Sequence, residues 1–102
     1  MTVRFNTTAL HIGEDLLPIG SVVRMEGVEP NIMIYGRKQS GIGGGDRVWD
    51  YVGCPYPQGH LSSDTNLFFD HEHIRELIFK GLETAGEIEL RKELRRLTAE
   101  KN

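Results

Sequence analysis

Alternating hydrophobic and polar positions divide the middle of the chain into short strands. Residues 20–27 alternate Val and Met with Arg and Glu, which indicates a strand with one buried and one solvated face. Residues 31–36 form a second, more apolar segment, and residues 46–53 form a third, alternating one. Residues 37–46 are polar and rich in glycine, so they are predicted to be a mobile surface connection. Residues 54–59 contain two prolines, which lack the N–H donor of a strand and therefore predict irregular structure.

The segment 66–81 carries two competing signals. Asp70 fits the N-cap of a helix and the apolar residues after it have helical spacing, whereas the apolar run before Gly81 is typical of a strand. One helical turn over residues 71–74 followed by a strand over residues 76–81 satisfies both patterns. The sequence therefore predicts this arrangement.

In residues 82–102 the spacing of hydrophobic residues becomes that of a helix. These residues contain no proline and are rich in Glu, Leu, Arg and Lys. Leu90, Leu94 and Leu97 are spaced by four and three positions and therefore share one face of this helix. This leucine row either packs on the chain's own sheet or forms a seam with another helix, including that of a second copy in a homodimer. Both alternatives stay open, because two heptads are too few for a stable isolated coiled coil.

Together these elements predict a mainly β fold of the α+β class, a small SH3-like barrel of about five short antiparallel strands with one C-terminal α-helix. The barrel is predicted over residues 17–81 and the helix over residues 82–102, packed on the barrel or on a partner. Residues 1–16 have no firm period and are predicted to form a loose N-terminal arm. Ten of the twelve glycines and all four prolines fall within residues 17–81, as expected for strands joined by tight turns.

Size, charge and cysteine content narrow the function classes. A chain of 102 residues has room for one domain, and its net charge of −3 argues against a nucleic-acid partner, which needs a basic face. No apolar run approaches the roughly 18–20 residues that span a bilayer, and the N-terminus lacks the pattern of a signal peptide. The single cysteine, Cys54, excludes an internal disulfide framework. These features predict a cytoplasmic protein without membrane insertion, and no motif predicts a cofactor.

The best candidates for a metal site are His71 and His73, with Asp70 beside them. Alternate histidines on a strand point the same way, and their imidazoles are ordinary zinc ligands. A complete site would still need a third ligand, such as His60 or Asp64. The favoured interpretation is therefore a polar turn with solvated histidines and no metal.

Cys54 is the candidate nucleophile, with His60 or His71 as its base. A reactive thiol needs a cationic neighbour or a helix N-terminus to lower its pKa. The sequence neighbours Gly53 and Pro55 supply neither. A small, half-buried residue at the end of a strand is the favoured interpretation.

Aromatic residues of the third strand are the first candidates for a protein-binding surface. If Val48 and Val52 face inward, then Trp49 and Tyr51 face outward, and Tyr56 lies nearby. Exposed Trp and Tyr side chains are enriched at protein interfaces. The alternative is that the C-terminal helix or the N-terminal arm covers this face. With the leucine row, the candidate protein-binding residues are Trp49, Tyr51, Tyr56, Leu90, Leu94 and Leu97.

Five segments occur here in the order found in one known family: Leu17–Val23, Ile32–Arg37, Trp49–Gly59, Phe68–Ile74 and Ile78–Gly81. On these segments the chain resembles the small Gram-positive bacterial family catalogued as domain of unknown function 4176. The resemblance covers about residues 16–85, and residues 49–59 are its most specific part.

The resemblance implies a bacterial cytoplasmic protein without a known catalytic activity. Genes of this family tend to lie beside type VII secretion components, small helical WXG-like proteins and LXG-domain toxins. The resemblance therefore implies a non-enzymatic, protein-binding accessory role, as a chaperone or adaptor for a type VII-secreted LXG-type toxin. The alternatives are a toxin-neutralising immunity protein and, third, a small metal- or thiol-dependent enzyme centred on Cys54, His60, His71 and His73.

Overall fold

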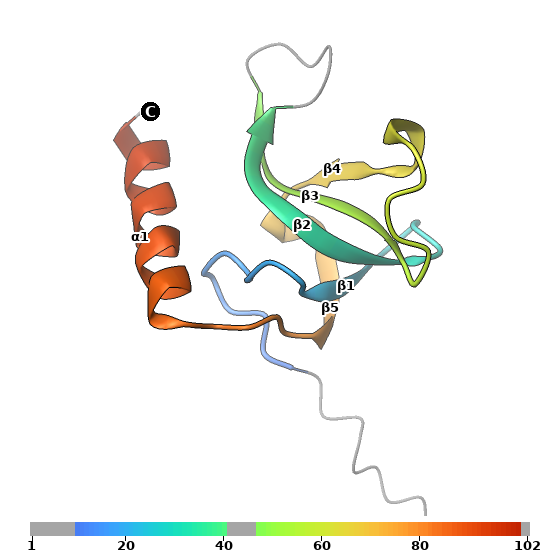
Figure 1. The fold of residues 1–102 in the computed structure, drawn as a ribbon, viewed down its shortest axis with the longest axis horizontal. Coiled ribbons are helices and arrows are strands. Elements are labelled where there is room, and N and C mark those ends of the chain that lie inside the picture. Colours follow the sequence, from blue (N-terminus) through green and yellow to red (C-terminus); the bar gives the residue numbers. More distant parts are fainter. Residues whose placement is uncertain (1–9, 41–46, 101–102) are drawn as a thin grey trace, which may run out of the picture.

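The computed structural model describes residues 10–40 and 47–100 of the chain (Figure 1). Five strands and one α-helix account for most of the described residues, with two single turns of 3-10 helix between strands. The predicted mainly β fold of the α+β class, with five antiparallel strands and one C-terminal helix, is confirmed. In chain order the elements are β1 (Val22–Met25), β2 (Asn31–Ser40), β3 (Val48–Tyr56), η1 (Ser63–Thr65), β4 (Leu67–Phe69), η2 (His71–His73), β5 (Ile74–Phe79) and α1 (Ala85–Glu100).

The five strands form one curved sheet in the order β4-β3-β2-β1-β5, and every neighbouring pair is antiparallel. The sheet is open, so β4 and β5 are its edge strands and the predicted barrel does not close. The long hairpin of β2 and β3 forms the centre of the sheet, as the ribbon in Figure 1 shows.

Strand β2 is longer than its apolar pattern predicts. Residues 37–40, expected in the surface connection, continue the strand because they pair with β3 through Arg37↔Tyr51 and Gln39↔Trp49. A register shift after Ile34 separates this half of the hairpin from the first. The rest of the predicted connection, residues 41–46, lies outside the described part of the chain.

Strand β3 continues through the segment that its prolines predicted to be irregular. Pro55 pairs with Ile32 of β2, and the strand ends only at Tyr56. Strand β4 pairs with β3 only as far as Gly53, so Pro55 lies where β3 has β2 alone as a neighbour. A proline is tolerated there because its missing N–H faces no partner strand.

The turn and strand predicted within residues 71–81 are confirmed as η2 and β5, which starts two residues earlier than expected. The turn is closed locally, since the His73 N–H donates to the Asp70 carbonyl and the Asp70 N–H donates to His73 Nδ1. The next residue, Ile74, is already buried in the core.

The hydrophobic core lies on one face of the sheet. Val23 of β1 pairs with Ile32 of β2 and with Leu77 of β5, and all three side chains are buried in the core cluster. Directly opposed residues on neighbouring strands point to the same face of a sheet. The register therefore assigns this face, and the rest of the cluster comprises Leu17, Met25, Ile34, Tyr51, Phe69 and Ile74.

The described part of the predicted N-terminal arm, residues 10–16, is not loose. Leu10 forms a β-bridge with Leu77 on the free side of β5, and Ile12 and Leu16 pack against the core cluster. The apolar residues of this segment have no period of their own, because they pack on an edge and a face of the sheet. Residues 1–9 lie outside the described part of the chain.

Helix α1 stands beside the sheet, next to the segment that precedes β1 (Figure 1). Thr84 caps its N-terminus by accepting a 3.1 Å hydrogen bond from the Glu87 N–H. The helix therefore begins at residue 85, later than the predicted residue 82, and residues 101–102 lie outside the described part of the chain. Among the residues whose burial the structure describes, those of α1 do not belong to the core cluster.

Candidate functional site

Tyr51, predicted to face outward, is fully buried in the core. Its hydroxyl accepts a hydrogen bond from the Leu17 N–H at 2.9 Å and lies 2.5 Å from His71 Nδ1. His71 Nε2 lies 2.8 Å from the carbonyl oxygen of Gly13, which can only accept, so Nε2 donates there and Nδ1 accepts from Tyr51. Burial raises the pKa of Tyr51, which keeps the phenol protonated. Tyr51 is therefore a structural anchor of residues 10–17 and not a contact residue.

The prediction that Tyr51 faces outward is wrong because the middle of β3 is buried on both faces. Tyr51, Val52 and Cys54 are all buried, so alternation of polar and apolar residues does not distinguish the faces. Val48, taken as the inward marker, is 44% exposed at the strand end.

Trp49 and Tyr56 do not form a common aromatic surface. They lie at opposite ends of β3, about 23 Å apart at the usual rise per strand residue. Trp49 is half-buried on the face that carries Tyr51, and the Arg47 guanidinium lies 3.8 Å from the centroid of its ring.

The second face of the sheet, opposite the core, is also apolar. Val22 pairs with Phe79 of β5 and with Met33 of β2, and Met33 pairs with Cys54 of β3. Opposed residues share a face, so these side chains form one row across four strands. We call this face, with its neighbours along β3 and β4, the outer face; it comprises Val22, Met33, Val52, Cys54, Tyr56, Phe68 and Phe79.

Two aromatic side chains of the outer face are open to solvent. Phe79 is 59% exposed and lies opposite Val22 in the register, and Tyr56 is 51% exposed and lies opposite Asn31 at the end of β3. Of the three aromatic residues predicted to bind a protein partner, Tyr56 is therefore the one that is exposed on the outer face. The row itself could not be predicted, because it depends on the register of strands up to 57 residues apart in sequence.

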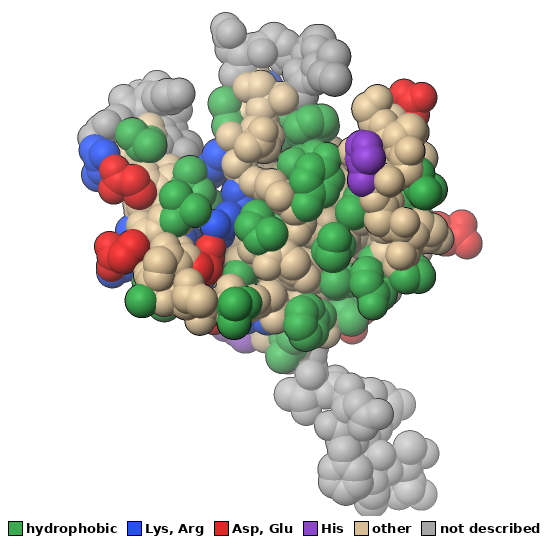
Figure 2. Space-filling view, in the orientation of Figure 1, with side chains coloured by type: hydrophobic (Ala, Val, Ile, Leu, Met, Phe, Trp, Pro, Cys, Tyr) green, Lys and Arg blue, Asp and Glu red, His purple; other side chains and the backbone are tan. Residues whose placement is uncertain are grey.

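Two residues of the leucine row of α1, Leu90 and Leu97, are open to solvent. Leu90 is 51% exposed and Leu97 is 44% exposed, while Leu94 is half-buried. Figure 2 shows hydrophobic side chains over the sheet and along α1 on one side of the molecule, with charged side chains between them. Leu90 and Leu97 therefore do not follow the alternative in which the leucines pack on the chain's own sheet.

Ion pairs hold α1 against the rest of the molecule. Arg37 of β2 is buried, its Nη2 lies 2.5 Å from Glu87 Oε1, and its Nη1 donates to the carbonyl of Leu17. Glu87 also lies 2.9 Å from Arg91 Nη2. Burial raises the pKa of Glu87, but hydrogen bonds from the two arginines outweigh that effect and leave the pKa below its usual value.

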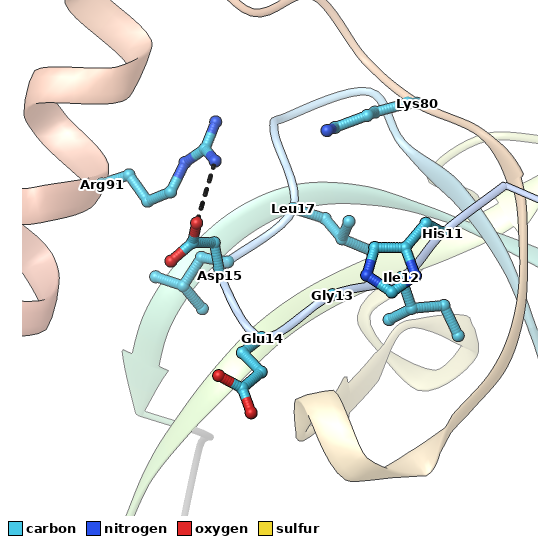
Figure 3. Close-up of a pocket in the computed structure, with 9 residues that line it drawn as sticks. His11, Ile12, Gly13, Glu14, Asp15, Leu17, Lys80 and Arg91 are labelled. Atoms are coloured by element: carbon cyan, nitrogen blue, oxygen red, sulfur yellow. Dashed lines mark ion pairs between the residues drawn. The ribbon is translucent and has the colours of Figure 1, made fainter.

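A small cavity lies between α1 and the segment before β1. Figure 3 shows the Asp15 carboxylate reaching toward Arg91, with Lys80 and His11 on other sides of the cavity. Its volume is about 150 Å³, smaller than the roughly 300–1,000 Å³ of ordinary small-molecule sites. Asp15 pairs with Arg95 as well, so the cavity belongs to the ionic attachment of α1.

The histidines proposed for metal binding or catalysis are engaged in separate hydrogen bonds. His71 bonds Tyr51 and Gly13, while the His60 Nδ1 lies 2.7 Å from the side-chain amide of Asn66. Cys54 is buried in the outer face. Within residues 10–40 and 47–100, no three or more His, Cys, Asp or Glu side chains are grouped so as to hold a metal ion.

None of the helices described by the structure is long and apolar enough to cross a membrane. A model of the family described as "Domain of unknown function (DUF4176)" matches residues 16–90. No curated protein and no solved structure matches the chain. The family match covers all five strands and the first turns of α1, so the described sheet is the part that the family shares.

Proposed function

Because this chain belongs to the DUF4176 family, whose description names no activity, we propose its function from its surface: it is a non-enzymatic module that binds a protein partner. The binding surface is the outer face of the sheet, with Phe79 and Tyr56 as its exposed aromatic contacts. The apolar row across four strands, with the exposed Phe79 at its β5 end and the exposed Tyr56 near its β3 end, is the observation that carries this proposal.

The composition of the outer face supports a protein partner. Contiguous apolar surface on a small domain is typical of interaction sites, and aromatic and methionine side chains are enriched at the centre of interfaces. Phe79, Met33 and Tyr56 are of these types and lie on the same face. The rigid sheet holds them in place without a partner, which reduces the ordering cost of binding.

The partner we propose is an LXG-type toxin or a WXG-like helical protein, on the basis of the family resemblance. The protein would then act in the cytoplasm as a chaperone or adaptor before secretion of the toxin. Residues 1–81 carry ten acidic and seven basic side chains, which favours a partner with basic residues around its apolar contact.

Titration calorimetry with the purified LXG region of a toxin encoded beside this gene tests the proposal. We expect Phe79→Glu to weaken binding about tenfold or more, because it replaces an exposed aromatic contact of the apolar face with a charge. The matched control is Ile88→Glu, an equally apolar residue that is 41% exposed on α1 and should leave this binding unchanged. Equal binding by wild type and Phe79→Glu would overturn the role of the outer face.

The same titration distinguishes a chaperone from an immunity protein. Binding to the isolated toxic domain, with none to the LXG region, would overturn the chaperone role in favour of immunity. Binding to the LXG region alone supports the adaptor or chaperone role.

A further inference from the structure

Tyr35 lies on the same side of the sheet as the outer face, beside the apolar row. Its neighbour Ile34 is buried in the core, and Arg37 pairs with a core residue of β3. The register shift between them adds one residue to β2, as in a β-bulge, so Tyr35 and Gly36 both lie on the opposite side of the strand. Gly36 pairs with Val52 of the outer face, and Tyr35 therefore shares that face, where it is 42% exposed.

The Tyr35 side chain crosses β3 to reach the strand beyond it. Its hydroxyl accepts a 2.9 Å hydrogen bond from Nδ2 of Asn66, the residue just before β4. In the sheet, β3 lies between β2 and β4 (Figure 1). Neighbouring strands are about 4.8 Å apart, so the ring lies over Val52 and Cys54, the outer-face side chains of β3. The ring therefore contributes to the burial of both residues, which are 4% and 2% exposed.

The amide of Asn66 holds the ring in this position at a cost. Its Nδ2 makes a second hydrogen bond, at 2.7 Å to Nδ1 of His60. The Oδ1 of the same amide is buried, and it has no hydrogen-bond partner in the part of the chain that the structure describes. A buried polar atom without a partner costs at least as much free energy as one hydrogen bond contributes. Because water reaches Oδ1 when the contact opens, the closed and open positions of Tyr35 are close in free energy.

From this balance we propose that Tyr35 is a lid, which covers the middle of the outer face in the free protein and swings away when a protein partner binds. The open lid exposes Val52 and Cys54, which extend the apolar row next to Met33. One hydrogen bond at an exposed side chain closes the lid, so it opens without unfolding the sheet. The opening on binding rests on the proposed function, whereas the closed lid is a property of the protein alone.

Cys54 reports the position of the lid, because it is the single cysteine of the chain. A disulfide reagent such as dithionitrobenzoate reacts only with a thiol that it can reach. Tyr35→Phe keeps the ring but removes the accepting hydroxyl, and it should speed the reaction of Cys54 several-fold. Asn66→Ala removes the donor of the same hydrogen bond and should have a similar effect. Tyr35→Ala removes the lid itself and should speed the reaction about tenfold or more.

His60→Ala is the matched control for the lid. It removes the second partner of Asn66 but leaves Tyr35 and its hydrogen bond in place, so the thiol should react at the wild-type rate. Urea denaturation of each variant separates opening of the lid from unfolding. An acceleration no larger than the fall in unfolding free energy predicts would overturn the proposal. A wild-type rate in Tyr35→Ala, or in both Tyr35→Phe and Asn66→Ala, would also overturn it.

Titration calorimetry with the LXG region tests the opening on binding. A lid that must open first lowers the measured affinity in proportion to the fraction of open molecules. Tyr35→Phe should therefore bind the LXG region several-fold more tightly than the wild type does. Equal affinities together with a faster thiol reaction would overturn the opening on binding. Absence of binding by both proteins would instead overturn the proposed function, and the thiol reaction then decides the lid by itself.

Discussion

At the scale of single residues, the hydroxyl of Tyr51 joins parts of the chain that are far apart in sequence. It accepts from the Leu17 N–H and donates to His71, which in turn donates to Gly13. A backbone N–H that loses its partner in a buried position costs about 1–3 kcal/mol. The segment before β1 is therefore held on the sheet by hydrogen bonds as well as by its apolar residues.

Tyr51→Phe should lower the free energy of unfolding by about 2 kcal/mol, because it removes the hydroxyl and leaves the Leu17 N–H without its acceptor. The ring itself remains and continues to pack against Phe69. Urea denaturation measures the change. Tyr35→Phe is the matched control: its hydroxyl meets Asn66 at a 42% exposed residue, so its loss should cost much less. Equal costs for the two variants would contradict the anchoring role of Tyr51.

Gly81 is a second residue with a specific structural demand. A Cβ at this position would overlap the carbonyl oxygen of Ile19 and lie 3.0 Å from its carbonyl carbon. Gly81→Ala should therefore destabilise the protein by about 3 kcal/mol, since backbone would have to move. Gly86→Ala is the control, because the nearest atom to its Cβ would be 3.7 Å away and alanine favours helix by up to about 1 kcal/mol. Thermal unfolding of both variants checks the contrast.

At the scale of elements, the turn and strand after Asp70 could be predicted because their signals are local. A capping residue and a short apolar run sit next to each other in sequence. The second half of β2 could not be predicted from local sequence, since Arg37 and Gln39 are polar and become strand residues only by pairing with β3. The outer face depends in the same way on register between distant strands, which no local pattern contains.

Attachment of α1 depends on the charge of Glu87. Its pKa is lowered in the fold, because hydrogen bonds from Arg37 and Arg91 outweigh the effect of burial. A carboxyl whose pKa is lowered in the fold stabilises the fold at pH values above its unfolded pKa, which is near 4.5. This stabilisation is lost as the pH falls from the unfolded pKa through the lowered pKa of the folded state. Acid should therefore weaken the attachment of α1 before it weakens the apolar contacts of the sheet.

Glu87→Gln should cost about 3 kcal/mol at pH 7, because it leaves the buried Arg37 guanidinium without its counter-charge. As the pH falls through the lowered pKa of Glu87, the wild type loses the same charge, so the difference between wild type and variant should shrink. Urea denaturation at a series of pH values measures this convergence. Glu89→Gln, at an exposed position of the same helix, is the control and should cost little at any pH. A cost of Glu87→Gln that does not change with pH would contradict the ionic attachment.

At the scale of the whole molecule, two kinds of force hold the parts together. Apolar burial on one face stabilises the sheet, and the described residues of α1 are not part of its core cluster. The helix is held by charges, from the buried pair of Arg37 and Glu87 to the exposed pair of Asp15 and Arg95. Salt screens the exposed ion pairs of the helix, the buried pair much less, and apolar burial not at all. The molecule should therefore open in two stages, with α1 released more easily than the sheet.

Hydrogen exchange in 1 M sodium chloride measures this difference. At that concentration the screening length is about 3 Å, so the exposed ion pairs of α1 lose most of their attraction. We expect the α1 amides to exchange several-fold faster than at low salt, while the amides of β2 and β3 stay protected. Equal acceleration of helix and sheet would mean that the two form one cooperative unit, against the division argued from their contacts.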